Sequence, residues 1–122
     1  MRITKSITFD AAHFLEAKSA KEAGRPYARM HGHSFSLDVT LEGTPSADTG
    51  WVADFADVSD ELDKIKDVLD HRLLNEVEGL EKPTLENICL WVANQLRPIF
   101  PSLKQVKVSR PSNGETCIFD ID

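Results

Sequence analysis

The chain contains four segments in which apolar and polar residues alternate, and two in which apolar residues recur every three or four positions. Alternation with a period of two is typical of strands with one buried face. Repeats at three- and four-residue steps are typical of amphipathic helices. We therefore predict strands over residues 2–14, 31–41, 103–110 and 116–121, a helix over 55–69, and a helix between Thr84 and Pro98.

This order of elements, strand-strand-helix-helix-strand-strand, predicts an α+β fold. Two helices placed across one face of a four-stranded antiparallel sheet would bury both kinds of apolar pattern. We expect a single domain over residues 1–122, and the order of the strands in the sheet stays open. Thr84 is the predicted N-cap of the second helix, because its hydroxyl is able to accept from a free backbone amide. Cys89 lies in the apolar stripe of that helix and is predicted to be a core residue.

Composition narrows the classes of function. Of the 122 residues, 41% are hydrophobic and 28% charged, which is ordinary for a globular protein. The net charge of −6 argues against nonspecific nucleic-acid binding, which depends on Lys and Arg. No apolar run is long enough to cross a membrane, and the first residues lack the apolar core of a signal peptide. Two cysteines do not make a disulfide framework, so we expect a reduced, cytoplasmic setting.

Three histidines fall at matching positions of the first two strands. His31 and His33 begin the apolar face of the second strand, and His13 ends the apolar face of the first. If the two strands pair antiparallel, the three side chains meet at one rim of the sheet. Three imidazoles with an open fourth position suit a catalytic metal ion. The alternative is three unrelated rim histidines, which the matching register disfavours.

Other candidate residues have plain structural explanations beside functional ones. Asp70 and His71 follow the first helix, where a carboxylate next to an imidazole can fix its tautomer, although a helix cap explains the pair equally well. Glu86 suits the helix dipole in the first turn of the second helix. Glu115 begins the last strand and is interpreted as a solvated turn residue. The long segment 15–30 is either a lid or a solvated loop, and it contains four basic residues that would meet an anion or lie scattered: Lys18, Lys21, Arg25 and Arg29.

Taken together, the motifs resemble the 6-pyruvoyl tetrahydropterin synthase and 6-carboxytetrahydropterin synthase family. The similarity covers nearly the whole chain in the right order, through residues 8–13, 31–35, 50–55, 69–71, 74–75 and 83–87. The resemblance implies the tunnelling fold, in which small subunits pack into rings with sites between them, and here a homohexamer of two stacked trimers. It also implies one zinc ion per subunit, held by His13, His31 and His33. The substrate implied is 7,8-dihydroneopterin triphosphate, and the product of the queuosine branch is 6-carboxy-5,6,7,8-tetrahydropterin.

The resemblance also assigns roles to individual residues. Asp70 and His71 match a catalytic pair, and Thr84 and Glu86 match positions near the pterin. Tyr27 stands where the family usually has a catalytic cysteine. Arg110 stands where the family places a glutamate that anchors the pterin, and Glu115 would supply that anchor from a shifted position.

The predicted function is therefore that of a zinc-dependent lyase acting on a reduced pterin triphosphate, in a form that lacks the usual cysteine. A phenol is a weaker acid than a thiol, so Tyr27 would need a large shift to act as a base, and His71 with Asp70 is the better candidate. Glu16 and Glu22 are further substitutes for the base. Two alternatives stay open: a different cleavage of the side chain, such as an aldol-type cleavage, and a noncatalytic zinc-containing pterin-binding protein.

Overall fold

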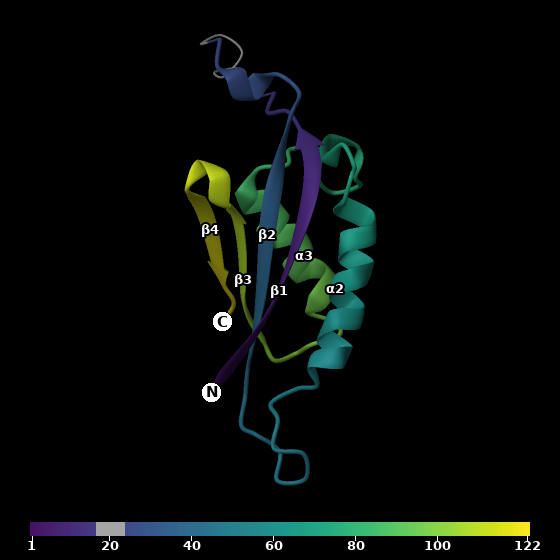
Figure 1. Ribbon diagram of the computed structural model, residues 1–122. Helices are drawn as coiled ribbons and strands as arrows, with labels where there is room; N and C mark the ends of the chain where they lie inside the picture. Colours follow the sequence, from purple (N-terminus) through teal and green to yellow (C-terminus); the bar gives the residue numbers. More distant parts are fainter. Residues whose placement is uncertain (17–23) are drawn as a thin grey trace.

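The computed structural model describes residues 1–16 and 24–122 (Figure 1). The expected order of strands and helices is confirmed, and the described connections contain three short 3-10 helices. The last strand begins and ends one residue earlier than predicted. In chain order the elements are β1 Arg2–His13, η1 Pro26–Ala28, β2 His31–Glu42, α2 Phe55–Leu69, η2 Leu74–Glu76, α3 Leu85–Leu96, β3 Leu103–Arg110, η3 Pro111–Asn113 and β4 Glu115–Asp120.

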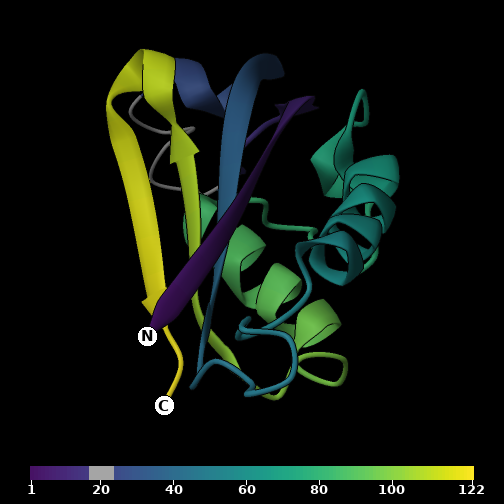
Figure 2. The same ribbon diagram turned by 60° about the horizontal axis from the view of Figure 1, so that its bottom comes forward.

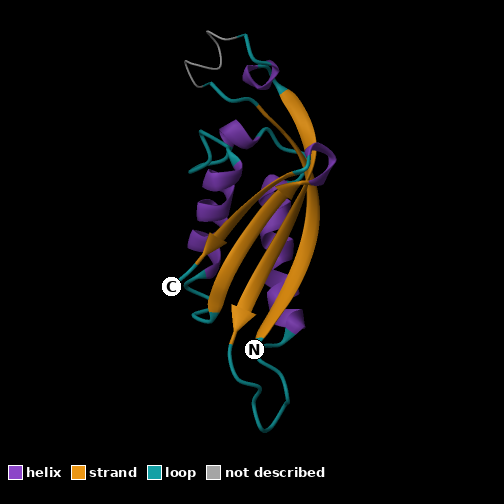
Figure 3. Cartoon of the chain, turned by 90° about the vertical axis from the view of Figure 1, so that its left-hand side faces the viewer, coloured by secondary structure: helices purple, strands orange, loops and turns teal. Residues whose placement is uncertain are grey.

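The four strands form one antiparallel sheet in the order β1-β2-β3-β4, which the sequence pattern did not reveal. Both α2 and α3 cover the same face of this sheet, as Figures 2 and 3 show from two further directions. The core lies between the helices and the sheet, where Phe9 stacks on Phe35 with ring centroids 5.0 Å apart. The predicted α+β architecture, with two helices on one face, is therefore confirmed.

The two helices follow their predicted patterns closely. Residues Val58, Leu62, Ile65 and Leu69 of α2 are buried, and its N-cap Asp54 accepts from the Ala56 amide. At the start of α3, Thr84 caps the helix as predicted, its hydroxyl oxygen lying 3.1 Å from the Asn87 nitrogen. Cys89 is buried in the core, also as predicted.

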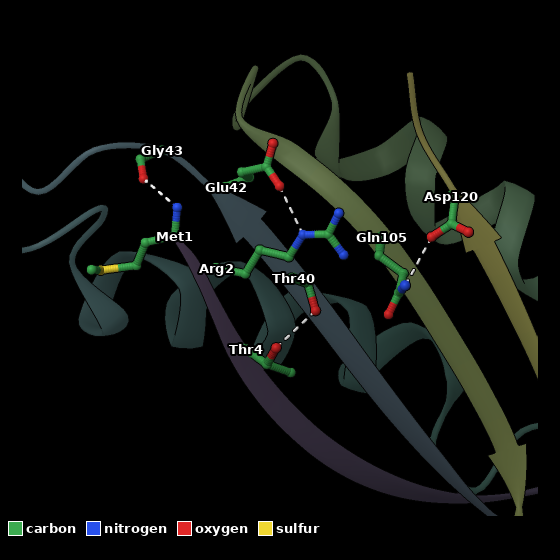
Figure 4. A network of polar contacts seen from close by, with 8 residues as sticks. All are labelled: Met1, Arg2, Thr4, Thr40, Glu42, Gly43, Gln105 and Asp120. Carbon is green, nitrogen blue, oxygen red and sulfur yellow. Dashed lines mark hydrogen bonds and ion pairs between the residues drawn. The ribbon is translucent and has the colours of Figure 1, made fainter.

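The uncovered face of the sheet is mostly polar. Near the start of β1, Arg2 pairs with Glu42 at 2.7 Å, and the Thr4 and Thr40 hydroxyls lie 2.8 Å apart (Figure 4). On the neighbouring strands, the Gln105 amide donates to Asp120 at 2.8 Å. Such exposed contacts each add little to stability.

One end of the sheet is narrower than the rest. β2 pairs with β1 along its whole length, from the pair of His13 and His31 onward, but it pairs with β3 only from Ser36. Residues 31–35 and their partners on β1 therefore extend beyond the last ladder pair of β3. Among the described residues, no helix is long and apolar enough to span a membrane.

Candidate metal centre and its surroundings

Three histidines gather at this narrow end of the sheet. His13 lies directly opposite His31 in the ladder, and His33 follows two residues later on the same face. The three ring centroids are 4.6, 4.7 and 5.1 Å apart. One ligand atom from each residue lies within 4.8 Å of the other two, so the three rings are able to share one metal ion. The predicted convergence of these side chains is confirmed.

Backbone carbonyls fix how two of the rings present their nitrogen atoms. His13 Nδ1 lies 2.9 Å from the Pro83 carbonyl, and His31 Nδ1 lies 2.6 Å from the Arg29 carbonyl. A carbonyl only accepts, so each Nδ1 carries the proton and each Nε2 presents a lone pair. The Nε2 atoms of His13 and His33 are buried without a hydrogen-bond partner. Burying a nitrogen without a partner costs free energy. A metal ion bound by all three rings would provide a partner for each Nε2 lone pair.

The environment favours the neutral form of two of these rings, His13 and His33. Burial lowers the pKa of His13 from 6.5 to about 4, helped by the nearby charges of His31, His33 and Arg110 and opposed by the bond to Pro83. Burial also lowers the pKa of His33, again with contributions from His31 and Arg110. Metal ligation requires the unprotonated imidazole, so both shifts favour a metal at neutral pH.

The lowered pKa of His13 predicts an acid-sensitive step in the unfolding of the metal-free protein. Because the unfolded chain binds this proton more readily, the stabilisation is complete above about pH 6.5 and is lost as the pH falls toward 4. The loss is expected to reach about 3 kcal/mol. Urea unfolding of chelator-treated protein at pH 7 and pH 4.5 measures it. A His13→Gln variant should lose less stability over this interval, and an equal loss in both proteins would contradict the prediction.

Asp70 and His71 form a pair that the backbone of β1 holds in place. The Asp70 Oδ2 lies 3.0 Å from His71 Nδ1, and its Oδ1 accepts from the Asp10 amide at 2.9 Å. The His71 amide donates in turn to the Asp10 carbonyl at 2.6 Å. The bond from the Asp10 amide, then that from His71, holds the pKa of Asp70 below its ordinary value, so the carboxylate stays ionised at neutral pH. Asp70 is also the C-cap of α2, so the capping and pairing interpretations both apply.

His71 has the left-handed backbone conformation, with φ of 57°, which is unusual for a residue with a side chain. Its imidazole is 80% exposed. His71, Ser34 and the metal-site residue His33 are among the residues that border one open hollow of about 580 Å³. Ser34 also donates to the Asp10 carboxylate at 2.5 Å. The hollow therefore lies between His71 and one residue of the histidine cluster, His33.

The other predicted site residues belong to the start of α3 and to the segment between β1 and β2. Glu86 is exposed in the first turn of α3, and the Thr84 hydroxyl is engaged in capping that helix. Tyr27 lies in η1 with 43% of its surface exposed, and its carbonyl accepts from the Leu15 amide at 2.9 Å. Glu16 is exposed beside that contact. Glu22 and the basic residues Lys18 and Lys21 lie outside the described residues.

Sequence reasoning treated Glu115 as a solvated turn residue, whereas the structure places it opposite Arg110 in the ladder. Its Oε1 lies 3.1 Å from Arg110 Nε. The signal for this contact was the turn at 111–114, which places residues 110 and 115 on the same face of two neighbouring strands. The roles of the Asp10 backbone, Ser34 and the Pro83 carbonyl were also missed, because each depends on contacts between segments far apart in the chain.

The fold and the cluster of histidines define this chain as a tunnelling-fold protein with a candidate metal centre. The chain belongs to the 6-pyruvoyl tetrahydropterin synthase family, which it matches over residues 2–121. The family resemblance seen in the motifs is therefore confirmed, and with it an enzyme family that processes pterins.

Individual relatives bear different activities. The chain is 36% identical over 121 residues to the dihydroneopterin monophosphate aldolase of Pyrococcus furiosus, covering 99% of this chain and 95% of that protein. It is 37% identical to the 6-carboxy-5,6,7,8-tetrahydropterin synthase of a Synechocystis strain, covering 94% of this chain and 86% of the relative. The structure of Caenorhabditis elegans 6-pyruvoyl tetrahydropterin synthase aligns with a TM-score of 0.89 over 100% of this chain and 96% of that one, at 24% identity. That last likeness shows the fold alone.

Proposed function

We propose that the protein is a zinc-dependent lyase that acts on the side chain of a phosphorylated, reduced pterin. The first candidate activity is that of a 6-carboxy-5,6,7,8-tetrahydropterin synthase with 7,8-dihydroneopterin triphosphate as substrate. The observation that carries the proposal is the group of three converging histidines, two of which, His13 and His33, have buried Nε2 atoms without a hydrogen-bond partner. His33 and His71 border the same hollow. The similarity to the Synechocystis synthase supports the choice of product.

Zinc is the proposed metal because three imidazoles with an open fourth position are a common catalytic zinc site. His13, His31 and His33 would hold it. When bound, zinc would polarise oxygen atoms of the substrate side chain and make their protons easier to remove.

His71 is the proposed base. Asp70 faces Nδ1 of the ring, and an ionised carboxylate only accepts, so Nδ1 carries the proton and Nε2 is free to take one. The Asp10 amide and carbonyl fix the carboxylate and the backbone of His71, and so restrict the position of the ring. A group held in this way is able to take a proton from one substrate atom and return it to another. Glu115, Glu86 and Thr84 remain the proposed contacts of the pterin ring.

A second candidate activity is an aldol-type cleavage to a hydroxymethylpterin. The similarity to the Pyrococcus furiosus aldolase favours it. Tyr27, which stands where the family resemblance places a cysteine, agrees with it. In such a cleavage, His71 takes the hydroxyl proton, a carbonyl forms at that carbon, and the electrons of the broken C–C bond pass into the conjugated ring system. The ring-side carbon then takes a proton back. This reaction needs one base, whereas the synthase reaction also moves protons bound to carbon.

Substitution of Tyr27 distinguishes the two candidates. We expect slow turnover of dihydroneopterin triphosphate by the natural protein, or a different cleavage, because Tyr27 is a poor base. Tyr27→Cys should then raise the formation of carboxytetrahydropterin, and product analysis by mass measures it. Tyr27→Phe is the matched control. Efficient carboxytetrahydropterin formation that Tyr27→Phe leaves unchanged would show that residue 27 has no part in the reaction.

We also propose a homohexamer of two stacked trimers. Within the described part of the chain, β1 and β4 are the outer strands of the sheet, and their unpaired backbone groups favour pairing between subunits. Light scattering should give a mass of about six chains at micromolar concentration. A monomer under these conditions would contradict the assembly.

A further inference from the structure

Two charged residues, Arg110 and Glu115, lie on β3 and β4 at the end of the sheet that carries the metal centre. At this end, β1 contributes His13 and β2 contributes His31 and His33. The next strand, β3, ends at Arg110, one residue past its last pair with β2, and β4 begins at Glu115 opposite it. Arg110 also has the parity of the buried residues Val106 and Val108, so it belongs to the face that carries the histidines.

The contact between Arg110 and Glu115 leaves the arginine incompletely satisfied. The guanidinium side chain is only 14% exposed, whereas that of Glu115 is 50% exposed. The Nε of Arg110 is buried and lies 3.1 Å from Glu115 Oε1, but the geometry of that approach is not that of a hydrogen bond. A buried guanidinium N–H without a well-aligned acceptor favours any anion that provides one. The exposed carboxylate is the part of the pair that is free to move aside.

The charge of Arg110 reaches the metal centre, because it contributes to the lowered pKa of both His13 and His33. With a divalent metal on three neutral imidazoles, the formal charges of the metal, Arg110 and Glu115 alone sum to about +2. That charge complements a dianion, and a phosphate monoester is close to a dianion at neutral pH. A planar guanidinium also binds phosphate through two parallel hydrogen bonds.

We propose that Arg110 is an anion-binding residue of this site, which takes a phosphate group of the substrate in place of Glu115. This inference rests on the proposed function for the identity of the substrate, but not for the anion site itself. Displacement of Glu115 from Arg110 frees its carboxylate to accept hydrogen bonds from N–H groups, which is the role proposed for it toward the pterin. Phosphate binding and ring binding would then support each other.

The first test measures the binding of inorganic phosphate to the zinc-loaded protein by calorimetry. Arg110→Gln should weaken phosphate binding at least about tenfold, the value of a charge-assisted hydrogen bond. Glu115→Gln should strengthen it, because the competing carboxylate is removed. The matched control is Arg97→Gln, since Arg97 is exposed over the Phe119 ring and belongs to α3's end, away from the histidines. Zinc content is measured for each variant.

Unchanged phosphate affinity in Arg110→Gln would overturn the proposal, as would weaker phosphate binding in Glu115→Gln. The second prediction does not need the arginine variant to fold. A further test compares dihydroneopterin with its phosphate ester: Arg110→Gln should weaken only the phosphorylated ligand, and an equal loss for both would contradict the assignment. If phosphate binding follows Arg110 but no pterin is bound or converted, the proposed function fails and the anion site stands.

Discussion

Replacement of both His31 and His33 by alanine should reduce the metal content from about one zinc per chain to less than about a tenth. One imidazole then remains, and a single neutral ligand does not hold zinc against dialysis. Elemental analysis of dialysed protein measures the ratio. The physical reason is the geometry of the centre: both rings approach His13 with their ligand atoms, and their removal leaves no second donor in the cluster.

His71→Ala is the matched control for this experiment, because it removes a histidine that borders the same hollow without belonging to the cluster. It should retain a full equivalent of zinc. Stoichiometric zinc in the double variant would disprove the assignment of the metal ligands.

His71→Ala should lower kcat by about a hundredfold or more while leaving zinc content and pterin binding close to those of the natural protein. The variant loses the proposed base but none of the metal ligands. Asp70→Asn should have a smaller effect, because the imidazole remains while its preferred tautomer is lost. Steady-state kinetics with product analysis measures both variants.

The backbone at His71 offers a second control for the same prediction. Glycine adopts a φ of 57° without the penalty that a side chain carries. The free energy of unfolding of His71→Gly should therefore exceed that of His71→Ala by about 1 kcal/mol. Both variants should be equally inactive. Wild-type turnover in either one would show that another group is the base.

The sequence predicted the fold well because periodicity reports burial directly. The alternation in β1 and β2 also placed three histidines on one face, and antiparallel pairing alone then brought His13 opposite His31. Contacts between distant segments were not predictable in this way. The carbonyl of Pro83, which orients His13 from 70 residues away, and the Asp10 backbone, which holds Asp70, depend on how α2 and α3 pack. Nothing in a local pattern encodes either contact.

The segment that follows α2 has a consequence for how subunits would join in the proposed hexamer. The Asp10 amide and carbonyl and the Ala12 amide point away from β2 and already bond to residues 70–72. In an antiparallel ladder the groups that point outward come from alternate residues, which leaves Arg2, Thr4, Ser6 and Thr8 for a neighbouring strand. A strand from another subunit could therefore form backbone hydrogen bonds with β1 only as far as Thr8. A strand shifted further toward the histidines would find no free backbone partners, so residues 70–72 would limit the register in which the proposed ring closes.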